Sequence, residues 1–444
     1  MSWSWKSRRV LVLGAGRTGV AVANFLCARG ARVVVADRKF PDSGGHALPQ
    51  SAEPISEATA LDLVSQVELV IPSPGVAPSH PVLRRARECH TPVWSEIELA
   101  FRELHVPLVA ITGTNGKSTT TVLVGEILRA AGHRAFVGGN LGTPLIEAVD
   151  DPNWTIAVAE VSSFQLEWVE MFRPRVGVFL NLTPDHLDRY ADLDAYGEAK
   201  MRLFARQDER DAAVLNRDDP WIWSRRREIR AVVRWFSLSS SAADAFADGT
   251  VVTVRGGPGS PWRMDLAPTA LQGVHNRENA MAALLVAREL GVSMDAASAA
   301  LASVRPLPHR LEFVREWHGV RFYDDSKGTN VGAVEKSLLS FPGNIVLLAG
   351  GYDKQGDFRS LVPLLRERVR YAVFFGAAGP KWAQQVGANV PHTVVSGLKE
   401  AVREAARVAN PGDVVLLSPG CASFDEFTDY ADRGRAFRTW VEEL

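Results

Sequence analysis

The sequence predicts an α/β protein of three domains, each with a largely parallel sheet whose loops gather at one edge. Three observations favour this class. The 444 residues are enough for about three domains of ordinary size. Residues 9–29 and residues 107–131 each read as an apolar strand, a glycine-rich turn and a helix. Residues 322–425 alternate apolar runs with helical segments, and each run ends in a polar or glycine-rich loop, as in an open α/β sheet.

Composition excludes several classes of protein. The apolar content of 46% and the charged content of 23% are ordinary for a globular chain. The net charge of −1 gives no overall field that would attract nucleic acid or a membrane. Three scattered cysteines, Cys27, Cys89 and Cys421, lack metal-ligand spacing and suit a reducing compartment. Residues 1–9 show no signal-peptide cleavage site and no run has membrane-spanning length, so we expect a cytoplasmic protein.

The first segment contains a complete nucleotide-binding fingerprint. A strand over residues 9–13 leads to Gly14, Gly16 and Gly19, then to a helix ending at residue 29 and a strand that ends at Asp37. This spacing would suit the diphosphate and ribose of NAD and, taken alone, indicates a dehydrogenase. The glycines specify only a diphosphate near a helix N-terminus, however, and any nucleotide diphosphate would serve.

Residues 69–71 form a further expected strand, and the loop after it would lie at the ligand-binding edge of the same sheet. We place the first domain boundary within residues 96–104, before the strand that leads to the second glycine turn.

The second glycine turn predicts a phosphate-binding loop. The apolar residues 107–112 form a buried strand, Gly113 and Gly116 turn the chain, and Lys117 opens a helix that continues to residue 131. Backbone N–H groups of such a turn point at phosphates, Lys117 adds a point charge, and the Ser118 hydroxyl can reach Mg²⁺. Only two residues separate the glycines, where the general pattern has four. A glycine-rich surface turn is the alternative, and the combination of strand, lysine and helix disfavours it.

Two polar groups follow neighbouring strands in the middle segment. Glu160 follows a strand at residues 156–158, and His186 follows a strand at residues 176–180. Both strand ends should share the edge that holds the phosphate loop, so the two side chains could reach one metal ion beside the last phosphate. Individually they could be a helix-capping carboxylate and a surface histidine. A helix over residues 194–206 then carries Lys200, which from the residues alone is a solvated surface lysine.

The rest of the chain shows weaker signals. Residues 237–261 predict hairpins and loops, residues 280–290 predict a helix, and residues 305–310 predict a linker. Lys327 and Lys354 lie in loops after two strands of the last segment. A single loop lysine usually faces solvent, but two at one sheet edge suggest an anion site.

The polar runs named above, taken together, resemble the Mur ligase family, including its shortened phosphate loop. The runs are residues 113–120, 160–167, 181–188, 275–280, 308–310 and 325–330. Residues 350–354 and 418–425 resemble the branch of that family that adds D-glutamate. The resemblance implies a UDP-substrate-binding Rossmann-like domain (1–98), a central P-loop ATPase domain with a mostly parallel sheet (99–306) and a C-terminal Rossmann-like domain that brings the amino acid (307–444).

The resemblance also assigns roles to single residues. It implies ATP contacts at Gly113, Thr114, Asn115, Gly116, Lys117, Ser118, Thr119, Asn276, Asn279, Arg310 and Asp325. It implies substrate contacts at Arg17, Thr18, Asp37, Ser73, Pro74, Gly75, Asn140, Ser162, His186, Lys327, Thr329, Lys354, Ser423, Phe424 and Tyr430. Two Mg²⁺ ions would be held by Ser118, Glu160, His186 and Lys200, the lysine acting as a carbamate. Lys117, Glu160, His186, Lys200 and Arg310 would form the catalytic set.

The implied activity is ATP-dependent addition of D-glutamate to UDP-N-acetylmuramoyl-L-alanine, by a monomer that acts on small molecules. Cationic and hydroxyl groups at Lys327, Thr329, Lys354 and Ser423 suit the two carboxylates of glutamate, whereas residue types do not distinguish D from L. L-glutamate is therefore the alternative acceptor. An NAD enzyme would leave the middle and last segments unexplained, and the folylpolyglutamate branch resembles the family only from the ATPase domain onward. The many charged loops on the ligand edge disfavour a purely structural protein.

Overall fold

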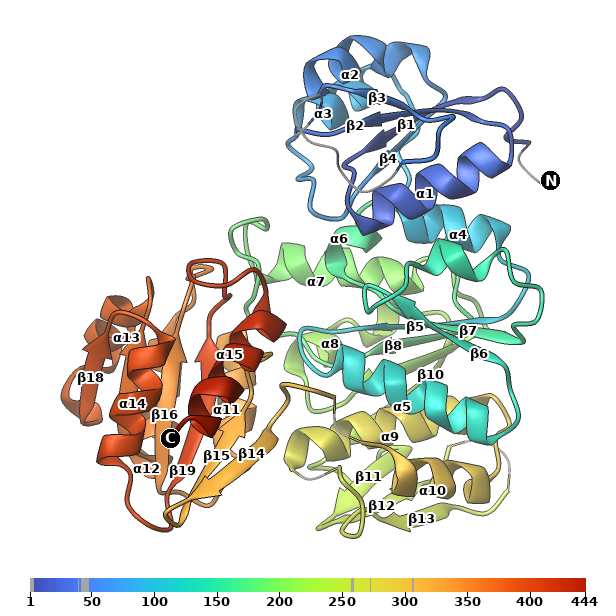
Figure 1. Ribbon diagram of the computed structural model, residues 1–444. Helices are drawn as coiled ribbons and strands as arrows, with labels where there is room; N and C mark the ends of the chain where they lie inside the picture. The colour runs from blue at the N-terminus through green and yellow to red at the C-terminus, as the bar shows by residue number, and fades with distance from the viewer. Residues whose placement is uncertain (1–3, 39, 41–47, 257–258, 272, 306) are drawn as a thin grey trace.

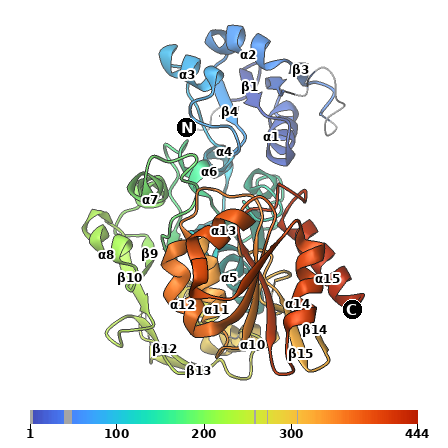
Figure 2. The same ribbon diagram turned by 90° about the vertical axis from the view of Figure 1, so that its left-hand side faces the viewer.

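Each of three α/β units in the computed structural model is built on one sheet (Figure 1). The model describes residues 4–38, 40, 48–256, 259–271, 273–305 and 307–444. The N-terminal and C-terminal units pack on different sides of the central unit, and a view turned by 90° shows the same arrangement (Figure 2). The expected α/β class is confirmed. Within the described ranges, no helix is both long enough and apolar enough to cross a membrane.

The N-terminal sheet is parallel, with strand order β3-β2-β1-β4. Its strands are β1 (Arg9–Leu13), β2 (Arg32–Ala36), β3 (Glu53–Ile55) and β4 (Leu69–Pro72). Its helices are α1 (Arg17–Ala28), α2 (Glu57–Leu63), η1 (Val64–Gln66) and α3 (Pro81–Glu88). The apolar side chains of β1 and β2 are almost fully buried, because helices cover the sheet on both faces.

The central sheet has strand order β13-β12-β11-β10-β9-β8-β5-β7-β6, and only the pairs β11–β12 and β12–β13 are antiparallel. Its strands are β5 (Leu108–Thr112), β6 (Ala135–Gly139), β7 (Ile156–Glu160), β8 (Val176–Phe179), β9 (Ala212–Asn216), β10 (Val232–Ser237), β11 (Ala245–Asp248), β12 (Val251–Val254) and β13 (Trp262–Asp265). The last three form the hairpin region expected near residues 237–261, of which residues 257–258 lie outside the described ranges.

Helices cover both faces of the central sheet. They are α4 (Glu96–Glu103), α5 (Lys117–Ala130), η2 (Leu145–Ala148), α6 (Ser163–Leu166), α7 (Leu193–Met201), η3 (Arg202–Phe204), α8 (Pro220–Ser224), η4 (Arg226–Glu228), α9 (Val274–Glu289) and α10 (Met294–Ser303). Helices α5, α9 and α10 share one apolar core with the sheet, and α4 and η3 share the other. That second core continues into the N-terminal unit, so these two units are joined by buried apolar packing.

The C-terminal sheet has strand order β14-β15-β19-β16-β17-β18, with one antiparallel pair, β14–β15. Its strands are β14 (Glu312–Trp317), β15 (Val320–Asp324), β16 (Ile345–Gly350), β17 (Val369–Phe375), β18 (His392–Val395) and β19 (Val414–Gly420). Its helices are α11 (Val331–Leu338), η5 (Phe358–Leu361), α12 (Val362–Arg368), α13 (Gly379–Val386), η6 (Gly387–Asn389), α14 (Leu398–Val408) and α15 (Tyr430–Glu442).

The domain divisions expected after residues 98 and 306 stay predictions. The first falls inside α4, and residue 306 lies outside the described ranges. Helix α4 is tied to the central unit: the Glu98 carboxylate accepts hydrogen bonds from the backbone N–H groups of Glu170, Met171 and Phe172. A buried carboxylate with three such donors fixes the helix in place.

Candidate functional site

The turn between β5 and α5 has the geometry of a phosphate loop. Gly116 has φ 84°, and a Cβ built there would lie 2.3 Å from the side-chain oxygen of Asn279, so only glycine fits. Asn181 braces the turn, because its carbonyl and its side-chain oxygen accept the N–H groups of Thr114 and Asn115. Helix α5 begins at Lys117, which places its positive N-terminus at the turn.

Two lysines contact the same carbonyl of this loop. Lys117 Nζ donates to the carbonyls of Gly113 (2.9 Å) and Thr114 (2.7 Å), and Lys200 Nζ donates to Gly113 at 2.9 Å. The expectation that Lys200 is a solvated surface lysine is wrong: it is 1% exposed, over the ring of Tyr196. Burial lowers the pKa of Lys200 well below its usual value, and the Lys117 charge lowers it further. Helix α7 therefore points this amine into the site.

Glu160 presents a free carboxylate oxygen beside the phosphate loop. It ends β7 and is 3% exposed; its Oε1 accepts a hydrogen bond of 2.6 Å from Asn140. Its Oε2 is buried and accepts no hydrogen bond from the part of the chain that the structure describes. Burial alone would raise the pKa of Glu160, but Lys117 lowers it and the net shift is downward. The side chain is thus an anion with one oxygen available, and Ser118 lines the same cavity.

His186 lines the same cavity from the loop after β8. Its backbone has φ 57°, and its ring packs edge-on against Phe164, 4.7 Å between centroids. Burial lowers the pKa of His186 to about 4, against the opposing effect of Asp185. The imidazole is therefore neutral at pH 7, which is the form that ligates metal ions.

Loops from the C-terminal unit close the other side of the same cleft. The expected site residues that line it are Thr114, Asn115, Gly116, Lys117, Ser118, Asn140, Glu160, Ser162, His186, Lys200, Arg310, Lys327, Thr329, Lys354, Ser423, Phe424 and Tyr430. The structure thus brings together residues from the central and C-terminal sheets. Their individual roles stay predictions.

Sequence reasoning missed several residues of this cleft, and three of them contact residues that were predicted. Asp185 Oδ1 lies 2.6 Å from Lys354 Nζ, and Asn330 connects Asp185 with the side chain of Asn115. The third is Tyr196, which is buried beneath Lys200. Asp185 precedes His186 at a strand end, and that position could have identified it. Asn330 ends the run that starts at residue 325, whereas nothing in the sequence marks Tyr196.

A second cavity adjoins the first and is lined partly by apolar side chains such as Leu271 and Val304. Asn115, Gly116, Thr119, Asn276, Asn279, Arg310 and Asp325 also line it. The expected helix over residues 280–290 begins earlier than predicted, at Val274, so both asparagines belong to the first turns of α9. Thr120 on α5 donates to Asn279, which fixes that amide beside the phosphate loop. The cavity therefore extends outward from the phosphate loop.

Asp325 and Arg310 connect the C-terminal unit with this cavity. Asp325 Oδ2 accepts hydrogen bonds from Ser337 (2.6 Å) and Ser418 (2.9 Å), and burial raises the pKa of Asp325 to about 6. Burial lowers the pKa of the Arg310 guanidinium, which lines both cavities. The two side chains thus present one anion and one cation to the same space.

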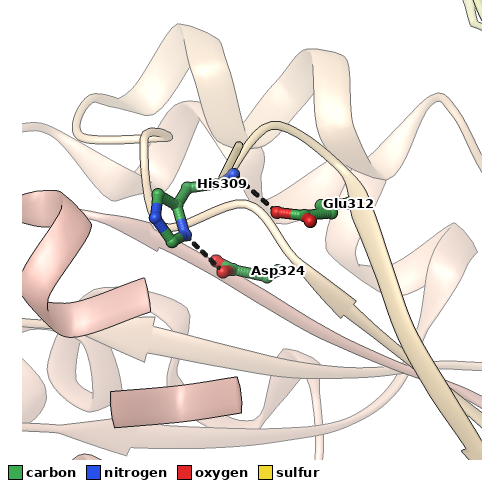
Figure 3. A group of neighbouring side chains, drawn as sticks. All are labelled: His309, Glu312 and Asp324. Atoms are coloured by element: carbon green, nitrogen blue, oxygen red, sulfur yellow. Dashed lines mark hydrogen bonds and ion pairs between the residues drawn. The ribbon is translucent and has the colours of Figure 1, made fainter. Parts of the chain in front are cut away.

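Arg310 lies in the chain between His309 and Glu312, which form a network with Asp324 (Figure 3). His309 Nδ1 lies 2.7 Å from Asp324 Oδ2, and the His309 backbone N–H donates to Glu312 at 3.0 Å. The remaining carboxylate oxygens accept from the Ser326 N–H and from Arg438. All four carboxylate oxygens thus have protein donors, so this network serves to hold the chain next to Arg310.

The fingerprint at Gly14 forms a separate polar edge in the N-terminal unit. Asp37 accepts the backbone N–H of Ala15 at 2.7 Å, and Ser73 Oγ donates to the Gly14 carbonyl at 3.2 Å. Arg17 is exposed and donates to the Gly142 carbonyl of the central unit. Thr18 lies in the first turn of α1, and Pro74 and Gly75 follow Ser73 in the loop after β4. This edge faces the central unit but lies outside both cavities described above.

Arg189 fixes the loop of Pro74 to the central unit. Its guanidinium donates to the carbonyls of Pro74 (3.3 Å) and Val76 (3.0 Å) and forms an ion pair with Glu167. The same side chain stacks on Phe164, 4.0 Å from the ring centroid. The loop after β4 is therefore tied to the central unit close to Glu167 and Phe164.

A site of this construction belongs to an enzyme that brings a nucleotide phosphate and an anionic second substrate together between domains. Three family descriptions match the chain: Mur ligase MurD-like N-terminal domain at residues 8–95, Mur ligase middle domain at 111–287 and Mur ligase glutamate ligase domain at 309–421. The chain belongs to the Mur ligase family.

Curated relatives match along their whole length. One from Syntrophus aciditrophicus, UDP-N-acetylmuramoylalanine–D-glutamate ligase, is 46% identical over 98% of this chain and 97% of its own. A protein of the same name from Geobacter metallireducens is also 46% identical, over 98% of each chain.

Solved structures share the fold at lower identity. A pseudomurein peptide ligase type C from Methanothermus fervidus has a TM-score of 0.64 and 17% identity, covering 98% of this chain and 100% of its own. MurF ligase from Thermotoga maritima has a TM-score of 0.62 and 21% identity, covering 100% of this chain and 97% of its own.

Proposed function

We propose that the protein is an ATP-dependent ligase that joins D-glutamate to UDP-N-acetylmuramoyl-L-alanine, a step in the synthesis of peptidoglycan precursors. The observation that supports this most strongly is the cleft itself. A phosphate loop with Lys117 faces cationic and hydroxyl groups of the C-terminal unit across one cavity. The full-length similarity to D-glutamate ligases agrees with this arrangement.

The chemistry explains why a phosphate site and an acceptor site must share a cleft. A carboxylate does not form an amide directly, because oxide is a poor leaving group. The alanine carboxylate attacks the γ-phosphorus of ATP, the bond to ADP breaks, and an acyl phosphate forms. The glutamate amine, having lost a proton, attacks that carbonyl, and the tetrahedral intermediate collapses with release of phosphate. The protein contributes positioning and charge neutralisation.

Lys117 and Arg310 would neutralise the transferring phosphoryl group from opposite domains. Both side chains line the same cleft, and the pKa of each is lowered mainly by burial. Charges in such a site interact more strongly than in water. Asn276 and Asn279 would contact adenine and Asp325 the ribose, in the cavity that continues outward from the loop.

Mg²⁺ would be held by Ser118 and Glu160 at a first site, and by His186, Glu160 and the modified Lys200 at a second. The buried, unpartnered Glu160 Oε2 fits this ion, because Mg²⁺ prefers hard oxygen ligands. The His186 ring is neutral, so a nitrogen lone pair is available for coordination. When bound, the ions supply charge to offset that of the phosphates. The presence of two ions is part of the proposal.

Lys200 would act as a carbamate, formed when its neutral amine adds CO₂. Support comes from its complete burial and lowered pKa, since only an unprotonated amine reacts. The resulting carboxylate would extend from α7 toward Glu160 and His186, which line the same cleft.

The UDP substrate would reach the cleft from the N-terminal unit, and glutamate would bind on the C-terminal side of the same cleft. Arg17, Thr18, Asp37, Ser73, Pro74 and Gly75 would hold the UDP part, and Asn140, Ser162 and His186 the part near the reacting carboxylate. Lys327, Thr329, Lys354, Ser423, Phe424 and Tyr430 would hold glutamate. The expectations of a monomer, of a cytoplasmic location and of no nucleic-acid or membrane partner stay predictions.

Phosphate release measured with purified protein, ATP and UDP-N-acetylmuramoyl-L-alanine tests the function. A panel of amino acids should include D-glutamate, L-glutamate and diamino acids. We expect turnover with D-glutamate and little with the others. If L-glutamate or a diamino acid supports faster turnover, the acceptor assignment is wrong.

A further inference from the structure

Helix α15 buries one arginine completely. Arg433 is 0% exposed, although most of its neighbours on this C-terminal helix are partly or fully exposed. Removing a guanidinium from water is costly, and the described residues form no ion pair with it. Burial lowers the pKa of Arg433 to about 10, so it stays charged at pH 7. Such a cation needs a structural or functional reason.

The Arg433 guanidinium donates five hydrogen bonds to two loops. Nε and Nη2 reach the hydroxyl (2.9 Å) and carbonyl (2.8 Å) of Ser326. Nη1 and Nη2 each reach the carbonyl of Cys421 at 3.1 Å, and Nη1 reaches that of Ala422 at 3.1 Å. Ser326 precedes Lys327 and Thr329, while Ala422 precedes Ser423. Arg433 therefore links two loops that line the acceptor side of the cleft.

A third loop is connected to the same point. The backbone N–H of Tyr352 donates to the Ala422 carbonyl at 2.8 Å, and the return bond measures 3.0 Å. A Cβ built on Gly351 would lie 3.0 Å from Arg433 Nη1. This third loop leads to Lys354. The three loops that carry Lys327, Ser423 and Lys354 thus meet at one guanidinium, the first two through direct hydrogen bonds and the third through Ala422.

We propose that Arg433 is a positioning residue for the amino-acid acceptor: it holds the three loops at the spacing that places Lys327, Lys354 and Ser423 around a dicarboxylate. The proposal rests on the proposed function. A planar fork with donors in fixed directions can satisfy several carbonyls at once, whereas an ammonium cannot. Lysine at this position would keep the charge and lose most of the links.

The test compares Arg433→Lys and Arg433→Met with Arg435→Lys and Arg435→Met. Arg435 lies on the same helix, is 63% exposed in its side chain and pairs only with Asp432 among the described residues, so it is a matched control. Apparent Michaelis constants are measured for D-glutamate, ATP and the UDP substrate. For Arg433→Lys we expect the Michaelis constant for D-glutamate to rise about tenfold or more, as when a charged hydrogen-bond donor is lost. The constants for ATP and the UDP substrate should rise less than about twofold.

Thermal melting and ADP titration show whether each variant is folded, and Arg433→Lys serves where Arg433→Met does not fold. Equal rises for all three substrates, or an unchanged constant for D-glutamate in folded Arg433→Lys, would overturn the proposal. Partial recovery of Arg433→Met with added methylguanidinium, for D-glutamate alone, would support it. Absence of turnover in the wild-type enzyme with D-glutamate would instead refute the proposed function, so the two failures are distinguishable.

Discussion

Lys354 of the C-terminal unit and Asp185 of the central unit form an ion pair across the cleft, with Nζ and Oδ1 2.6 Å apart. The two side chains are only 17% and 8% exposed. Asn330 adds a hydrogen bond of 3.2 Å to the other carboxylate oxygen. The lysine that we propose for glutamate binding thus already contacts the central unit, at the side of the loop that carries His186.

Lys354→Ala should raise the apparent Michaelis constant for D-glutamate by about tenfold to a hundredfold, because a buried carboxylate of the acceptor loses its cation. The constant for ATP should change far less. Steady-state phosphate release measures both. Lys399→Ala is a suitable control, since Lys399 is exposed on α14 and does not line the cleft. A comparable rise for ATP would contradict a role in acceptor binding.

Lys117→Ala should reduce phosphate release by about a thousandfold or more, because the charge beside the outer phosphates is lost. The melting temperature should change little, since glycine geometry and the Asn181 contacts hold the loop. Arg129→Ala, at the far end of α5, is the control: Arg129 pairs with Glu126 at the surface. Turnover close to wild type in Lys117→Ala would mean that this loop is not the ATP site.

Much of the fold could be predicted because strand ends carry local signals. The limits expected for β1, residues 9–13, agree with the structure, and Gly116 can be identified because a strand, a glycine turn and a lysine are adjacent in sequence. Glu160 and His186 were placed at one edge by a general property of parallel sheets. These inferences required only short-range patterns and a rule of topology.

Burial produced by distant segments could not be predicted. Lys200 reads as a surface lysine because its helix is weakly amphipathic, and only the packing of α7 onto the phosphate loop buries it. Arg433 is likewise indistinguishable from exposed arginines until the loops after β15 and β19 meet on it. Helix α9 begins at Val274 because Gly273, with φ 87°, allows the turn. The residues just after Gly273 are polar and show no helical apolar pattern, so the sequence predicts a later start for this helix.

The glycine turn at Gly14 should bind the UDP substrate and not NAD. Asp37 already accepts the N–H of Ala15, and Arg17 points toward the central unit, where the rest of the substrate would lie. Isothermal titration with each ligand measures this directly. Arg17→Ala should weaken binding of the UDP substrate by about tenfold, as expected for one charged hydrogen bond. Saturable micromolar binding of NAD(H), without binding of UDP sugars, would restore the dehydrogenase interpretation.

His275 should make the fold sensitive to acid. Burial lowers its pKa from 6.5 to about 4, with Lys336 and Arg310 contributing. Below pH 6.5 the unfolded chain takes up a proton that the folded protein does not, so this group destabilises the fold progressively as pH falls toward 4. The effect cannot exceed about 1.4 kcal/mol per pH unit.

Melting temperatures of ligand-free wild type and His275→Gln, compared at pH 7.5 and pH 5, measure this contribution. We expect the melting temperature of the wild type to fall more on acidification than that of His275→Gln. His133→Gln is the control, because His133 hydrogen-bonds Thr155 at the surface. Equal losses for all three proteins would show that His275 does not titrate as its surroundings suggest.

Lys200 should need CO₂ for activity. Its amine is buried, donates to the Gly113 carbonyl at 2.9 Å and has a lowered pKa, so it can react with CO₂ as the free base. Enzyme decarbonated at low pH and assayed in CO₂-free buffer should lose most activity and regain it with added bicarbonate. The activity of Lys200→Ala should be at least about a hundredfold lower than that of the wild type, as when a metal ligand or its support is removed.

A short carboxylate such as acetate should partly restore Lys200→Ala, because it can occupy the position of the missing carbamate. Lys399→Ala is the control, since Lys399 is exposed on α14 above Trp440. A high-resolution map of the metal-loaded, substrate-bound enzyme should show three extra atoms on Nζ. A bare ammonium in that map, or full activity of Lys200→Ala, would rule out the carbamate, because a metal ion would then be held without the carboxylate that the buried amine is proposed to supply.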